Sequence, residues 1–128
     1  TYNKSQITGH SLPQLRLSDA MAAQDAGMAL VLSNCREALV TAEANSRWNV
    51  IDKIRWRRDA AYASTAAVQA TDRLFQAQGG DAIYTRNAIQ RQFRDMHAGA
   101  AHIGISNDVN GVAFGRVVLG MDSENPMI

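Results

Sequence analysis

Hydrophobic residues along this chain recur with the 3.6-residue period of α-helices, and strand-like alternation does not persist anywhere. From residue 13 to about residue 46, apolar side chains keep this spacing, which predicts one long amphipathic helix. Ser11 and Pro13 mark its start, since proline suits the first helical turn. The apolar stripe consists of Leu17, Met21, Met28, Val31, Cys35, Leu39 and Ala42.

A second long helix is predicted from Asn49 to about Gln78. The Asn49 side chain can cap its first turn, and Asp52 carries a charge that suits the helix dipole there. Small side chains in its middle let another helix pack closely against it. These are Ala60, Ala61, Ala63, Ala66, Ala67 and Ala70. The pair Gly79-Gly80 is a normal C-terminal stop.

Two short helices complete the pattern. After a loop at residues 81–86, Asn87 and Gln90 have capping-box spacing before a helix that runs to about Ala101. A joint containing Gly104 follows, and a last helix, capped by Ser106 or Asn107, ends by Gly120.

The fold prediction is therefore all-α, an antiparallel four-helix up-and-down bundle. Residues 1–12 are expected to be a flexible lead-in, residues 13–120 the bundle, and residues 121–128 a tail.

Composition narrows the class of protein. A net charge of +1 and 46% hydrophobic residues indicate a soluble globular chain, with no reason to expect nucleic acid or membrane as partners. The basic run Arg55, Arg57 and Arg58 is expected to form a solvated or ion-paired helix face. A single cysteine, Cys35, excludes an internal disulfide, fits the cytoplasm, and is expected to be a small core residue rather than a nucleophile.

The last third of the chain carries a more specific motif. It has a glutamine, two further residues, a glycine pair, a loop, and a short charged helix that ends in Arg-Asp. The matching residues are Gln76, Gly79, Gly80, Arg94 and Asp95. In this order the segment resembles the C-terminal domain of the acyl-CoA dehydrogenase superfamily, and the resemblance extends back to about residue 13.

The resemblance implies that Gln76, Gly79 and Gly80 contact the flavin of a neighbouring subunit. Glycine lets backbone N–H groups approach a ligand closely, and the glutamine amide both donates and accepts. Arg91 and Arg94 share a helix face and are candidates for a flavin phosphate or an intersubunit carboxylate. The alternatives are a glycine pair that only stops the helix, and arginines that are solvated or paired locally.

The junction after the Arg-Asp helix points to one branch of the superfamily. Many acyl-CoA dehydrogenases carry Tyr-Glu-Gly-Thr there, and its glutamate removes the substrate α-proton. Here the stretch is His102-Ile103-Gly104-Ile105, and an isoleucine cannot take a proton. With a histidine at this place, the segment is similar to the flavin-dependent monooxygenase branch, which includes the oxygenase components of 4-hydroxyphenylacetate 3-monooxygenase and dibenzothiophene monooxygenase.

That branch implies a two-component system. A separate flavin reductase supplies reduced flavin, normally FMN with FAD as the alternative, and O₂ adds to it to give a C4a-(hydro)peroxide that oxidises a small molecule. His102 is then the catalytic candidate, because an imidazole can hydrogen-bond or move a proton near neutral pH. The resemblance also implies a homotetramer. It further implies an N-terminal helical domain and a middle β-domain outside these residues, without which the chain is expected to be inactive.

Two other functions stay open. One is an acyl-CoA dehydrogenase whose catalytic glutamate lies on an earlier helix, and the other is a helical oligomerisation module without chemistry, in which His102 is structural. A metal site is not expected, because His97 and His102 are five residues apart and project about 140° from each other around a helix.

Overall fold

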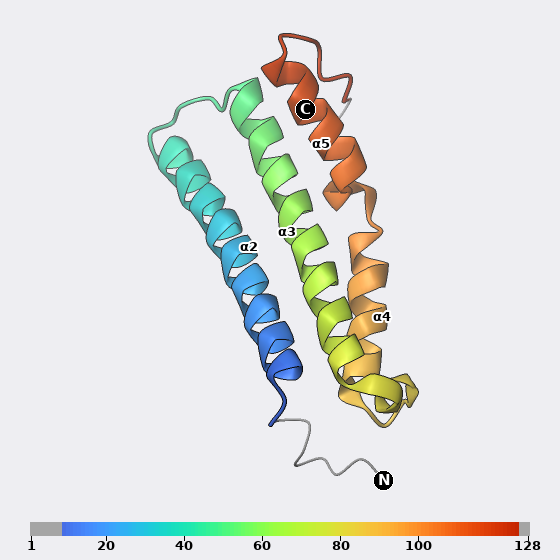
Figure 1. The fold of residues 1–128 in the computed structure, drawn as a ribbon. Helices are drawn as coiled ribbons and strands as arrows, with labels where there is room; N and C mark the ends of the chain where they lie inside the picture. Colours follow the sequence, from blue (N-terminus) through green and yellow to red (C-terminus); the bar gives the residue numbers. More distant parts are fainter. Residues whose placement is uncertain (1–8, 126–128) are drawn as a thin grey trace.

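The computed structural model describes residues 9–125, which form four α-helices and two short 3-10 helices without any strand (Figure 1). In chain order these are α2 (Ser11–Glu43), α3 (Val50–Ala77), η1 (Gly79–Ile83), α4 (Ala88–Ala100), η2 (Ile103–Ile105) and α5 (Asn107–Val118). The all-α prediction with two long and two short helices is confirmed. No helix in the described part of the chain is long and apolar enough to cross a membrane.

The helix α3 lies at the centre of the arrangement. α2 runs antiparallel to it on one side, while α4 and α5 follow one another along its other side, both antiparallel to α3 (Figure 1). With 13 and 12 residues, α4 and α5 together are about as long as the 28-residue α3. The four helices thus form three columns. The central column, α3, runs opposite to the two outer ones, and the two short helices share one outer column.

The helix ends follow some of the predicted signals and depart from others. The Asn49 side chain accepts a hydrogen bond from the backbone N–H of Asp52 at 2.8 Å, and so caps α3. α2 stops at Glu43, earlier than the expected residue 46, because Asn45 adopts a left-handed conformation with φ of 50°. Asn87 caps α4 through the N–H of Ile89, so the expected reciprocal capping box does not form.

Small residues line the contact between the two long helices. The buried residues of α2 are Ala20, Gly27 and Asn34, each seven positions after the last. A Cβ added at Gly27 would lie 3.3 Å from the Cβ of Ala63, so the two backbones approach closely at this point. The expectation that the alanine-rich middle of α3 permits tight packing is confirmed.

A buried polar network ties α2, α3 and α5 together. Asp59 is 1% exposed and accepts hydrogen bonds from Asn34 Nδ2 at 2.9 Å and from Arg58 Nε at 2.8 Å. The Arg58 guanidinium also lies 4.1 Å from the centre of the Phe114 ring. Burial of this carboxylate is tolerated because it is both paired and hydrogen-bonded.

A second ion pair, between Glu37 of α2 and Arg55 of α3, lies on the solvent-exposed side of this network. Arg55 Nη2 donates to Glu37 Oε1 at 2.6 Å, and this hydrogen bond holds the pKa of Glu37 below its usual range. The same bond raises the pKa of Arg55. The basic run of α3 is therefore ion-paired at Arg55 and Arg58, as the sequence predicted.

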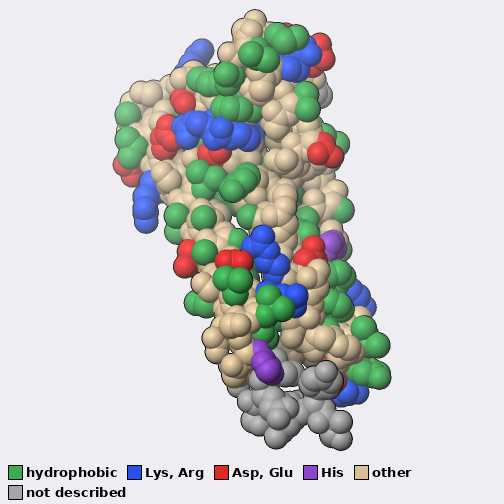
Figure 2. Space-filling view, in the orientation of Figure 1, with side chains coloured by type: hydrophobic (Ala, Val, Ile, Leu, Met, Phe, Trp, Pro, Cys, Tyr) green, Lys and Arg blue, Asp and Glu red, His purple; other side chains and the backbone are tan. Residues whose placement is uncertain are grey.

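The apolar stripe of α2 does not face α3. Leu17, Met21, Met28 and Leu39 are 51–61% exposed, and Cys35 is exposed as well, so the prediction that Cys35 belongs to the core is wrong. The reason is that α2 packs on α3 through its small residues, which leaves its large apolar residues outside. Hydrophobic side chains accordingly reach the surface along the length of the molecule (Figure 2).

Candidate functional site

The end of α3 and the loop after it form a well-defined surface. Gly79 has φ of 63°, which ends the helix, and η1 follows at once. The Asp81 carboxylate then accepts hydrogen bonds from Arg86 Nη2 at 2.5 Å and from Asn87 Nδ2 at 3.1 Å. Arg86 also covers the Tyr84 ring at 4.2 Å. These contacts fix the path of the loop between α3 and α4.

The predicted cofactor residues Gln76, Gly79 and Gly80 lie together at this end of the molecule, and both glycines are exposed. The left-handed backbone explains the glycine at position 79. Gly80 has no positive φ, and a Cβ at this position would meet no heavy atom within 4 Å, so the chain itself does not require glycine there. An open backbone at this point fits a ligand or partner that approaches from outside.

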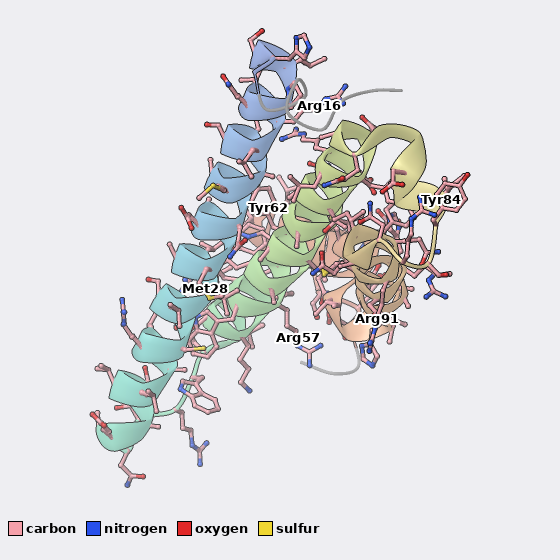
Figure 3. All side chains as sticks on the ribbon, turned by 90° about the horizontal axis from the view of Figure 1, so that it is seen from below. Arg16, Met28, Arg57, Tyr62, Tyr84 and Arg91 are labelled. Carbon is pink, nitrogen blue, oxygen red and sulfur yellow. The ribbon has the colours of Figure 1, made fainter. Side chains whose placement is uncertain are left out.

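The two predicted arginines lie on the exposed surface of α4. Arg91 Nε is 3.3 Å from Asp95 Oδ2 in an i,i+4 pair, and both side chains are well exposed, so this contact contributes little stability. Arg94 is exposed and has no ion pair among residues 9–125. Figure 3 places Tyr84 and Arg91 on the side of the molecule away from α2. Of the two arginines, Arg94 is the better candidate for an external anion.

His102 lies at the joint between α4 and α5. Its Nδ1 accepts a hydrogen bond from the backbone N–H of Gly104 at 3.0 Å and so caps η2. The imidazole is exposed, and the neighbouring Ile103 side chain is 65% exposed. His97, by contrast, pairs with Asp72 at 2.8 Å and packs on the Phe93 ring, which is a structural role.

The structure separates the predicted site residues into two groups. The first, called here the glycine-pair cluster, consists of Gln76, Gly79, Gly80, Arg91 and Arg94. His102 lies beyond the other end of α4, whose 13 residues span about 20 Å. Within one chain, the glycine pair and His102 therefore cannot touch the same small group, while Arg94 lies between them near the middle of α4.

Two cavities flank η2, and no pattern in the sequence predicted either. One, of about 500 Å³, has Ile103, Val109 and Val112 among its lining residues. The other, of about 520 Å³, is lined in part by Trp48, Trp56 and Lys53. The two indoles meet edge to face at 5.8 Å. The lining residues of each cavity come from separate elements, so spacing along the chain does not reveal them.

The described residues define an all-helical domain with two exposed candidate surfaces. Residues 1–107 match the family model described as the acyl-CoA dehydrogenase C-terminal domain, and the chain belongs to this family.

Its curated relatives include oxygenase components. The p-hydroxyphenylacetate 3-hydroxylase oxygenase component of Acinetobacter baumannii is 36% identical over 73 residues, which is 57% of this chain and 17% of that protein. The FADH(2)-dependent resorcinol hydroxylase oxygenase component of a Rhizobium species is 27% identical over 113 residues, 85% of this chain and 28% of that protein.

A solved structure shows the same fold. The HsaA monooxygenase from M. tuberculosis superposes with a TM-score of 0.86 at 27% identity, covering 93% of this chain and 31% of that one. The chain therefore spans less than a third of the length of these three relatives. Its resemblance to the monooxygenase branch of the superfamily is confirmed.

Proposed function

We propose that this chain is the C-terminal part of the oxygenase component of a two-component flavin-dependent monooxygenase. The observation that carries the proposal is the exposed joint between α4 and α5, where His102 and Ile103 stand in place of the usual catalytic carboxylate. An imidazole suits proton transfer and hydrogen bonding to a reacting oxygen, whereas an isoleucine excludes α-proton removal at this place. The names of the relatives support the same class of reaction.

The glycine-pair cluster fits a flavin. The Gln76 amide can donate and accept, the open backbone at Gly80 admits close approach, and Arg94 can pair with a phosphate. Arg91 is a weaker candidate because it already contacts Asp95. When bound, reduced flavin supplies the electrons that activate O₂. His102 would act at the reacting end, donating a hydrogen bond or moving a proton.

The cofactor is proposed to be reduced FMN from a flavin reductase. FAD is the alternative, because one relative is named as FADH(2)-dependent. The oxygenase is proposed to be a cytoplasmic homotetramer that also carries an N-terminal helical domain and a middle β-domain. Those parts and neighbouring subunits would cover the exposed apolar stripe of α2.

The test is an oxygen-transfer assay on the enzyme that contains this chain. A reductase supplies reduced FMN or FAD, and phenols and amines are offered as substrates under ¹⁸O₂. One ¹⁸O atom in the product supports the proposal. Reduction of bound FAD by an acyl-CoA overturns it in favour of an acyl-CoA dehydrogenase. Correct assembly with neither reaction favours a purely structural module.

A further inference from the structure

We propose that the turn from His102 to Ser106 fixes the neutral imidazole of His102 as the Nε2–H tautomer, with Gly104 and Asn110 as positioning residues. His102 then presents a hydrogen-bond donor at Nε2 and cannot act as a base through Nδ1. The catalytic role of the Nε2 donor rests on the proposed function, whereas the tautomer follows from the contacts of the chain alone.

The first support is the hydrogen bond itself. The N–H of Gly104 points at His102 Nδ1 at 3.0 Å, and a backbone N–H can only donate. Nδ1 must therefore be the unprotonated nitrogen of the neutral ring, and the proton lies on Nε2. No ion pair with His102 exists among residues 9–125, so no carboxylate there favours a proton on Nδ1.

The second support is the space above Gly104. A Cβ at this position would lie 3.0 Å from Nδ1 and 3.1 Å from Cε1 of His102, closer than side-chain carbons normally approach. The φ angle of Gly104 is not positive, so the backbone conformation does not require glycine. The lack of a side chain is what lets the ring fold back over the turn.

The third support is the anchor beneath the turn. Asn110 of α5 is 1% exposed, and its Nδ2 donates to the carbonyl oxygens of Ser106 at 2.8 Å and Gly104 at 3.3 Å. A buried side-chain amide with two backbone acceptors holds the turn against α5. The direction of the Gly104 N–H, and with it the position of the imidazole, is thereby fixed from the core.

The tautomer can be measured without any substrate. Solid-state ¹⁵N NMR of the ¹⁵N-histidine-labelled enzyme that carries this chain, at alkaline pH, gives the His102 signals by difference from a His102→Asn variant. We expect an unprotonated, hydrogen-bonded Nδ1 and a protonated Nε2. In Gly104→Ala the Nδ1 signal should move towards that of an acceptor without a hydrogen bond. Gly99→Ala, at an open glycine of α4, is the matched control and should leave it unchanged.

A protonated Nδ1 in the wild type, or an Nδ1 signal that does not move in Gly104→Ala, would overturn the proposal.

The role of the Nε2 donor in catalysis is tested by measuring turnover of two variants in which an amide side chain, Asn or Gln, replaces His102. The Asn amide oxygen can stand at the Nδ1 position and keep the cap, but it leaves no donor at Nε2, whereas Gln can place a donor there. We expect His102→Asn to keep the unfolding midpoint and to lose about 10²-fold in kcat. His102→Gln should retain more activity.

Equal activity of His102→Asn and the wild type would contradict a donor role for Nε2. Failure of the proposed function is a separate result, because it would appear as absent ¹⁸O transfer by the wild-type enzyme while the NMR spectrum still reports the tautomer.

Discussion

Three glycines of this chain lie in three different surroundings, and the absence of a side chain has a different consequence at each. Gly27 allows two helix backbones to approach, Gly104 leaves room for the imidazole of His102, and Gly80 is open to the outside. Only the first consequence concerns packing between helices. The other two concern residues of the proposed site, so their substitution should affect function more than stability.

The close helix crossing at Gly27 gives a stability prediction. Gly27→Leu should lower the free energy of unfolding by about 1–3 kcal/mol, because the side chain must enter the space that Ala63 occupies. The measurement is urea unfolding followed by circular dichroism. Gly99→Ala should instead raise stability by up to about 1 kcal/mol, since it improves helix propensity at an open site. Unchanged stability of Gly27→Leu would mean that the two helices are not in close contact here.

The Glu37–Arg55 pair gives a pH prediction. The pKa of Glu37 is lower in the folded chain than the ordinary value of 4.5, so its stabilising effect is full above that pH. The effect is lost as the pH falls through the lowered folded-state pKa. Wild type should therefore be more stable than Glu37→Gln at neutral pH, and the difference should vanish on acidification. Urea unfolding between neutral and strongly acidic pH measures it.

Glu43→Gln is the control for that series, because Glu43 is exposed and has no ion pair within the described part of the chain. It should show no comparable pH-dependent difference. A Glu37→Gln difference that persists below the folded-state pKa would show that packing, rather than charge, accounts for the effect.

At the scale of the elements, helix ends were more predictable than helix faces. Asn49, Gly79 and Asn87 act through contacts a few residues away, and local sequence contains all the information that such contacts need. Which face of α2 is buried depends on what α3 offers. The alanine-rich face of α3 packs against the small residues of α2, and the large apolar residues of α2 are therefore exposed to solvent.

The exposed stripe of α2 predicts an interface. Met21→Lys combined with Met28→Lys should break the assembly of the enzyme into smaller species, because two charges would be buried where subunits meet. Light scattering after size exclusion measures the mass, and circular dichroism should show unchanged helicity. Ser33→Lys is the control, since Ser33 is exposed and lies about 140° around the helix from Met28. An unchanged mass for the double variant would refute the interface.

At the scale of the whole molecule, the candidate site is divided by the length of α4. The motif in the sequence identified the members of both groups, but it could not show that the full 13-residue length of α4, about 20 Å, lies between the glycine pair and His102. The hydrogen bond from Gly104 to His102 and the bonds from Asn110 join residues only two to six positions apart, but the helical period does not reveal them because they form in the turn between α4 and α5. Under the proposed function, the glycine pair and His102 of one chain would therefore serve two different flavins.

Mixed assemblies of two inactive variants test this division most directly. His102→Ala removes the imidazole, and Gly80→Val blocks the open backbone of the glycine-pair cluster, where nothing in the chain opposes a side chain. Each variant alone should lose most oxygen transfer. Co-expressed with different tags and purified as mixed oligomers, they should regain a substantial part of the wild-type activity, because some sites then combine an intact His102 with an intact glycine pair from the neighbour. Mixed oligomers that stay as inactive as their parents would contradict the account.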